Sequence, residues 1–203
     1  MAELTFDIRY DEQRSRLTNA FRGILSIPLV IVLYFWSLFA GILAFVQWFI
    51  VLFTGKRNQA LWDLEYDYLG FAGRVNGYSN LMFDPYPPFG TAQGATPAVL
   101  ALQYEETGSR LTNGLRFIWA IPALIILWVL SIAFGVVVII SWFAIVITAK
   151  HPRGLFDFSL NVLRYTLQAN AYLLLMTDTY PKWGSGVGAP APVPGSPLPP
   201  PGR

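Results

Sequence analysis

Two long apolar segments dominate the hydropathy pattern of the chain. No charged residue occurs in 23–55 or in 117–149, so each segment is an uncharged run of 33 residues. Runs of more than about 18 apolar residues are typical of membrane-spanning helices. The first 22 residues are rich in charge and do not have the pattern of a signal peptide. We therefore expect an integral membrane protein.

Each run is too long for one upright crossing. A straight helix of that length would measure roughly 50 Å, whereas the hydrocarbon core of a bilayer is about 30 Å thick. Two short helices joined near 37–41 and near 131–135 fit this thickness better. All Lys and Arg residues lie outside the runs, and hairpins would place them on one side, which the positive-inside rule makes the cytoplasm. This favours four short membrane helices, with two single crossings as the alternative.

The second half of the chain repeats the first at an offset of 94 residues. The sequence Ser-Arg-Leu-Thr-Asn at 15–19 returns at 109–113, and both copies close with Tyr-Pro-x-x-Gly. Self-similarity of this kind indicates a tandem duplication. We expect repeat units at 1–94 and 95–184, parallel to each other about an axis along the membrane normal. A proline-rich, disordered tail over 185–203 follows them.

Each unit is predicted to contain three parts. Leu4, Phe6, Ile8 and Tyr10 alternate with polar residues and indicate a half-buried strand, which we expect to pair with its counterpart at 98–104. The apolar hairpin comes next, and an amphipathic helix follows, as at 61–82, which suits the membrane interface or a position packed against the membrane helices. The predicted fold is thus mainly α and integral to the membrane. It comprises two tandem parallel repeats, each a short β-strand, an apolar transmembrane helical hairpin and an amphipathic interfacial helix.

The second copy also carries a recognisable motif. It reads Thr-Ala-Lys-His-Pro-Arg-Gly-Leu-Phe-Asp-Phe at 148–158 and ends in Thr-Asp-Thr-Tyr-Pro at 177–181. With Arg116 and Ala-Ile-Pro at 120–122, it resembles the bacterial membrane family catalogued as domain of unknown function 4389. The first copy resembles the motif less closely, because it lacks the proline and the second glycine. The resemblance implies a bacterial membrane protein and brings no activity, cofactor or catalytic residue.

The composition restricts the possible chemistry. Hydrophobic residues make up 54% of the chain and charged residues 13%, which does not suit an ordinary soluble globule. The absence of Cys excludes thiolate metal sites and cysteine nucleophiles. The one histidine, His151, is interpreted as a basic interfacial residue rather than a general base. Asp63 and Asp67 lie one turn apart and could suit Mg²⁺, but Asp67 is Asn161 in the second copy. We expect no metal, no cofactor and no nucleic-acid partner.

The residues that recur in both copies are the candidate site residues. The expected lipid-headgroup or topology anchors are Arg16, Arg22, Lys56, Arg110, Arg116 and Lys150. The expected structural residues are Asp63 and Asp157, which would cap or begin their helices, Asn76 and Asn170, and Pro28 and Pro122, which would kink theirs.

The uncharged runs argue against an ion pump, which generally needs ionisable groups within the membrane. The role we expect is a non-enzymatic accessory or scaffold subunit of a bacterial membrane complex. It would lie in the inner membrane as a multi-pass protein with cytoplasmic termini. Its partners would be the bilayer and larger membrane subunits or a second copy, packed through Gly41 and Gly135. The alternative is a small transport or lipid-handling protein with its site between the repeats, and a membrane enzyme ranks third.

Overall fold

A computed structural model describes residues 3–89 and 96–187 of the chain. In this part, each repeat contributes a short strand, a five-residue helix, a long apolar helix and a shorter helix. The elements are β1 (Thr5–Ile8), α1 (Arg16–Ala20), α2 (Arg22–Thr54), α3 (Gln59–Ser79), β2 (Ala98–Ala101), α4 (Arg110–Gly114), α5 (Arg116–Thr148) and α6 (Arg153–Leu173).

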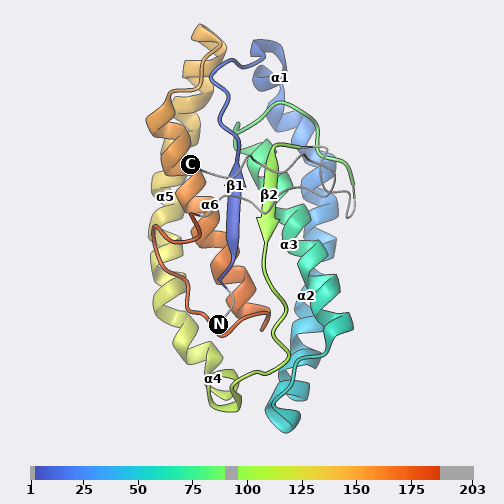
Figure 1. Cartoon of the computed structure of the whole chain (residues 1–203). Helices are drawn as coiled ribbons and strands as arrows, with labels where there is room; N and C mark the ends of the chain where they lie inside the picture. Colours follow the sequence, from blue (N-terminus) through green and yellow to red (C-terminus); the bar gives the residue numbers. More distant parts are fainter. Residues whose placement is uncertain (1–2, 90–95, 188–203) are drawn as a thin grey trace, which may run out of the picture.

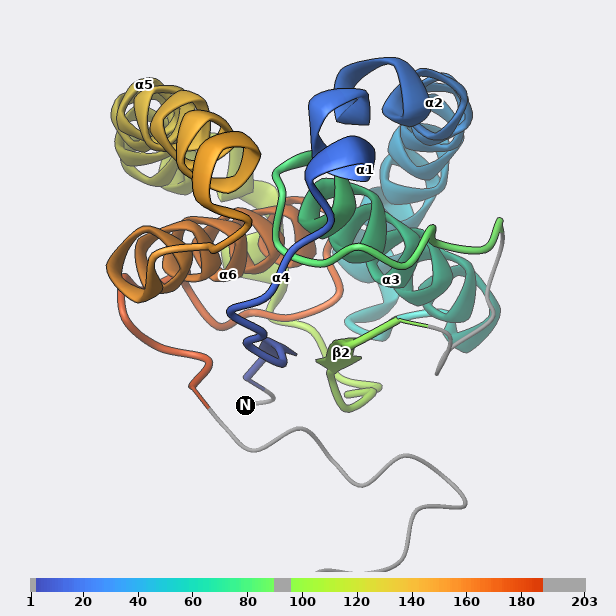
Figure 2. The same cartoon turned by 90° about the horizontal axis from the view of Figure 1, so that it is seen from above.

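The elements form three layers. The long helices α2 and α5 make the first layer and run in opposite directions (Figures 1 and 2). In the second layer α3 packs along α2, and α6 packs along α5. The ribbon of β1 and β2 covers the other side of that layer. In addition, α1 packs against the end of α5 and α4 against the end of α2. The two repeats are therefore related by an approximate twofold rotation about an axis that runs through the layers.

The hairpins predicted within the apolar runs are wrong. Both α2 and α5 are continuous helices of 33 residues. No residue in 37–41 stops the helix: the Ser37 hydroxyl donates to the Tyr34 carbonyl oxygen at 2.7 Å, and Gly41 stays helical. Ser131 makes the same bond to Trp128. Ser and Gly residues at these positions are therefore accommodated within the helices and do not form turns.

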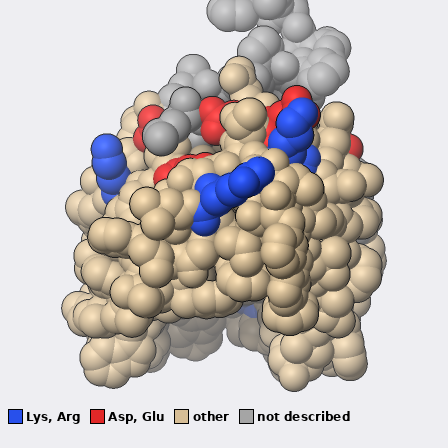
Figure 3. All heavy atoms as spheres, turned by 90° about the horizontal axis from the view of Figure 1, so that it is seen from below, with Lys and Arg blue, Asp and Glu red and all other residues tan. Residues whose placement is uncertain are grey.

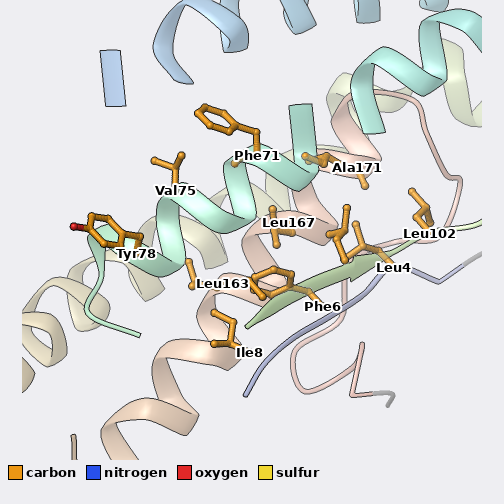
Figure 4. Packing of buried hydrophobic residues seen from close by; sticks show 14 of the residues in the cluster. Leu4, Phe6, Ile8, Phe71, Val75, Tyr78, Leu102, Leu163, Leu167 and Ala171 are labelled. Carbon is orange, nitrogen blue, oxygen red and sulfur yellow. The ribbon is translucent and has the colours of Figure 1, made fainter. Parts of the chain in front are cut away.

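The predicted strands and their pairing are confirmed, although both strands end before the predicted Tyr10 and Tyr104. β1 and β2 are antiparallel, with Thr5 opposite Ala101 and Ile8 opposite Ala98. The apolar face of the ribbon is buried against α3 and α6, where Phe6 and Ile8 point toward Leu163 and Leu167 (Figure 4). This cluster is the core of the molecule.

The helices predicted to be amphipathic, α3 and α6, lie in the middle layer, covered on one side by the long helices and on the other by the ribbon. The glycines of α3 allow this close packing. A Cβ atom at Gly73 would lie 2.8 Å from the ring of Phe6, and one at Gly77 would lie 2.7 Å from the ring of Phe83.

Two predictions concern residues outside the described part of the chain. They are the proline-rich tail, of which residues 188–203 are not described, and the repeat boundary at 94–95.

Candidate functional site

The outer layer presents an apolar face. Only a narrow stripe of α2 is buried, at spacings of three and four residues that include Leu29, Leu43 and Val51. Fifteen large apolar side chains of α2 and fifteen of α5 are exposed. Both helices are long and apolar enough to cross a membrane. Soluble monomers rarely expose a continuous apolar patch larger than a few hundred Å².

Charge is segregated from this face. In Figure 3 the two apolar ridges are tan, with a hollow between them, while Lys, Arg, Asp and Glu gather toward the opposite side. An open cavity of about 360 Å³ lies between the start of α2 and the end of α5. Its lining residues are Ala20, Arg22, Gly23, Ser79, Leu81, Val138, Ile139 and Trp142.

An ion pair with a buried guanidinium fixes the start of α2. The Arg22 side chain is 2% exposed, and its guanidinium lies 2.7 Å from Asp84 and stacks on the Tyr78 ring at 4.1 Å. Arg22 also donates to the carbonyl oxygens of Tyr78 and Phe83. Asp84 in turn accepts from the backbone N–H of Ser15 at 2.8 Å. This cluster joins α1, α2 and the segment after α3.

The second copy has the same cluster with one more cation. Arg116 Nη2 lies 2.5 Å from Asp178, and its guanidinium stacks on the Tyr172 ring. Arg57, from the loop after α2, reaches across the repeats to lie 2.8 Å from the same Asp178 carboxylate. It also donates to the Leu175 carbonyl oxygen at 2.6 Å. The two repeats are thus linked through a buried charge cluster.

The first copy obtains its second cation from a different position. At this first cluster His151 lies at the position equivalent to Arg57, and Gly108 lies at the position equivalent to Arg14 near the second cluster. Arg14 is buried and donates to the carbonyl oxygen of Met82, close to Asp84. Burial and the nearby Arg14 lower the pKa of His151 to about 4. His151 is therefore neutral and fully buried, and its predicted role as a basic interfacial residue is wrong.

The six predicted anchors fall into two groups. Arg22 and Arg116 are buried in the charge clusters. The other four, Arg16, Arg110, Lys56 and Lys150, are exposed and lie at the two ends of the molecule. Lys56 pairs with Glu106 at 2.8 Å, and Lys150 pairs with Glu12 at 2.9 Å.

The predicted structural residues are also distributed over several roles. Asp63 and Asp157 do not cap their helices, because α3 is capped by Asn58 and α6 begins after Pro152. Asp63 is exposed, and Asp157 pairs with Arg153. The Asn76 and Asn170 side chains donate to the carbonyl oxygens of Ala72 and Thr166 one turn earlier, and Pro28 and Pro122 lie within α2 and α5.

Two buried polar residues were not predicted from the sequence. Glu65 of α3 is fully buried, and in the described structure neither carboxylate oxygen has a hydrogen-bond partner. Burial raises its pKa to about 8. Gln47 of α2 is also fully buried, and its side-chain oxygen accepts from the backbone N–H of Asn58. Their counterparts Ser159 and Ser141 are polar as well, and that recurrence is the signal in the sequence that could have revealed them.

Comparison with known proteins places the chain in a family. A sequence model described as "Domain of unknown function (DUF4389)" matches residues 16–90 and again residues 110–184. No curated protein and no solved structure matches the chain. The two matches cover the helices of the two repeats and leave out β1 and β2.

Proposed function

The chain belongs to the DUF4389 family, whose function is unknown, and we propose that it is a membrane scaffold embedded flat in one leaflet. In this arrangement α2 and α5 lie parallel to the bilayer plane, and the ribbon faces water. The observation that carries the proposal is the apolar face itself, which gathers the exposed side chains of both long helices on the side opposite the ribbon.

The twofold arrangement of cations supports a flat rather than an upright orientation. Arg22 and Lys150 lie at one end of the molecule, and their equivalents Arg116 and Lys56 lie at the other. An upright molecule would place matched cations on both sides of the membrane, against the positive-inside rule. A flat molecule places all of them at one membrane surface. The twofold axis then lies along the membrane normal.

The ribbon supports the same orientation. It lies midway along α2 and α5 (Figure 1), so an upright molecule would hold it near the centre of the bilayer. Each of its strands pairs on one side only, which leaves two backbone edges. Open sheet edges do not occur in contact with lipid, because unsatisfied N–H and C=O groups cost several kcal/mol each. In the flat orientation water satisfies these edges.

We further propose a non-enzymatic accessory role, in which the water-facing layer is the surface offered to partner proteins. Both ends of the described chain lie on this layer, since the Gly186 N–H donates to Glu3 near β1. A cytoplasmic placement at the bacterial inner membrane fits the cations at the membrane surface. Isolation in mild detergent tests this role. A stoichiometric partner supports it, and a lone protein without crosslinks in cells contradicts it.

Membrane depth tests the flat placement. The chain has no Cys, so single nitroxide labels at Phe39→Cys, Ile132→Cys and Arg9→Cys are specific. We expect the labels on α2 and α5 to be accessible to oxygen and shielded from a water-soluble nickel complex. The label beside the ribbon should be accessible to nickel. A shielded label at residue 9 would indicate an upright molecule and contradict the proposal.

A lipid-handling role is the second candidate. The observation that favours it is the cavity between the ridges, whose volume of about 360 Å³ lies within the usual range for ligand sites, roughly 300–1,000 Å³. Movement of labelled lipid in vesicles that contain the protein would support this role, and a rate equal to that of empty vesicles would count against it.

A further inference from the structure

We propose that the cavity between α2 and α5 binds one glycerophospholipid of the surrounding leaflet, with an acyl chain along Val138 and Ile139 and the phosphate at Arg16. The inference rests on the proposed membrane placement, which puts the hollow between the ridges in contact with lipid. It adds a defined ligand site to that placement.

The walls of the cavity suit a chain with a polar end. Leu81, Val138 and Ile139 supply apolar surface, while Arg22 and Ser79 supply polar groups. The guanidinium of Arg22 is held by Asp84 and by backbone carbonyl groups, yet its Nε–H has no partner among the described residues. The Ser79 hydroxyl is buried and also lacks a partner there. Both donors lie just beneath the cavity wall, so an ester oxygen of a phospholipid, which is an acceptor, would satisfy them once a side chain at the wall shifts.

An exposed cation lies one helical turn from a residue that lines the cavity. Ala20 lines the cavity from the last position of α1, and Arg16 is four residues earlier. Residues at this spacing share one face of a helix, here about 6 Å apart along its axis. Arg16 is exposed and forms no ion pair with any described residue. A guanidinium is well suited to bind a phosphate because its N–H groups match the phosphate oxygens.

The second copy differs at the equivalent positions, which predicts one site per chain. Phe117 replaces Gly23, and Leu173 replaces Ser79. The second copy therefore lacks both the small residue and the hydroxyl that border the cavity in the first copy.

Native mass spectrometry of the full chain tests the site. The protein would be extracted from vesicles of phosphatidylethanolamine and phosphatidylglycerol, and we expect one retained phospholipid per chain. Gly23→Phe and Ser79→Leu introduce the residues of the second copy and should lower the retained fraction about tenfold. Gly41→Phe is the control, because it lies on the same helix and a Cβ atom at either glycine meets nothing within 4 Å.

The cation is tested by a second matched pair. Arg16→Gln should weaken retention of phosphatidylglycerol, whereas its equivalent Arg110→Gln should not. The site is refuted if the wild type retains no phospholipid, if it retains two, or if Gly41→Phe loses as much as Gly23→Phe. Flotation of the protein with the vesicles distinguishes the membrane placement from the phospholipid site. A chain that floats with the vesicles but retains no phospholipid after extraction contradicts only the site. A chain that does not float contradicts the membrane placement.

Discussion

At the residue scale, the duplication preserves a charge cluster while exchanging the residues that build it. Both copies surround a carboxylate with two buried guanidinium groups. The second cation is Arg14 in the cluster around Asp84, and it is Arg57, contributed by the first repeat, in the cluster around Asp178. These two positions are not equivalent in sequence. His151 is the residue equivalent to Arg57, and Gly108 is the residue equivalent to Arg14, so neither cation has a cationic equivalent. Because the cations are buried and the carboxylates are only partly exposed, losing either cation leaves a carboxylate with less compensation.

This exchange predicts that two substitutions, Arg14→Gly and His151→Arg, have strongly non-additive effects on the unfolding free energy. Arg14→Gly removes a charged hydrogen bond to the Met82 carbonyl oxygen and should cost about 1.5–3 kcal/mol of unfolding free energy. Adding His151→Arg reproduces the arrangement of the second copy and should restore more than half of that loss. Denaturant unfolding in detergent measures both values. A double variant no more stable than Arg14→Gly would contradict the account.

The buried Glu65 predicts a pH dependence of stability. Burial raises its pKa from 4.5 to about 8, so the folded chain keeps a proton that the unfolded chain has released above pH 4.5. Stability should therefore fall as pH rises through this window, by about 1.4 kcal/mol per pH unit, and level off above pH 8. Glu65→Gln should flatten the profile between pH 6.5 and 8, as measured by thermal unfolding.

Two features keep this test specific. The histidine does not interfere, since His151, with its pKa lowered to about 4, affects stability only as pH falls below 6.5. Asp63→Asn is the control, because Asp63 is exposed two residues from Glu65 on the same helix. An unchanged slope in Glu65→Gln would show that another group is responsible.

At the element scale, the two long helices end in the same way with different residues. Gly55 ends α2 with a φ of +75°, and Ala149 ends α5 with a φ of +57°. This left-handed conformation suits glycine and costs about 1–2 kcal/mol for other residues.

Exchanging these two residues should change stability in opposite directions. Ala149→Gly relieves the strain and should stabilise the chain by about 0.5–1 kcal/mol, after allowance for the greater freedom of glycine in the unfolded state. Gly55→Ala should destabilise it, in part because the added Cβ would lie 3.1 Å from Arg110. Chemical denaturation compares the two variants, and effects of the same sign would refute the argument.

The elements that could be predicted from the sequence are those with a local pattern. The alternation from Leu4 to Ile8 predicts β1, and the offset of 94 residues predicts the repeat. The charge clusters could not be predicted, because Arg22 and Asp84 are 62 residues apart and only the packing of α3 on α2 brings them together. The hairpin prediction failed for another reason. It used the bilayer thickness to place a turn in each run, whereas α2 and α5 are continuous helices.

At the scale of the whole molecule, the twofold symmetry determines how the chain can meet a membrane. A flat molecule has one apolar face and one polar face, which matches the observed segregation of charge. Helices embedded in one leaflet also need no match to the bilayer thickness, so their length of 33 residues causes no mismatch. The central claim is therefore the orientation of α2 and α5.

The most direct test is the sidedness of the two ends of the molecule. Lys56 and Lys150 are exposed equivalents at opposite ends, and the chain has no other Cys to interfere with Lys56→Cys and Lys150→Cys. A membrane-impermeant maleimide would be applied to sealed vesicles of uniform orientation. We predict that both cysteines react from the same side of the membrane. Reaction of the two cysteines from opposite sides would show that the helices span the bilayer and would contradict the account.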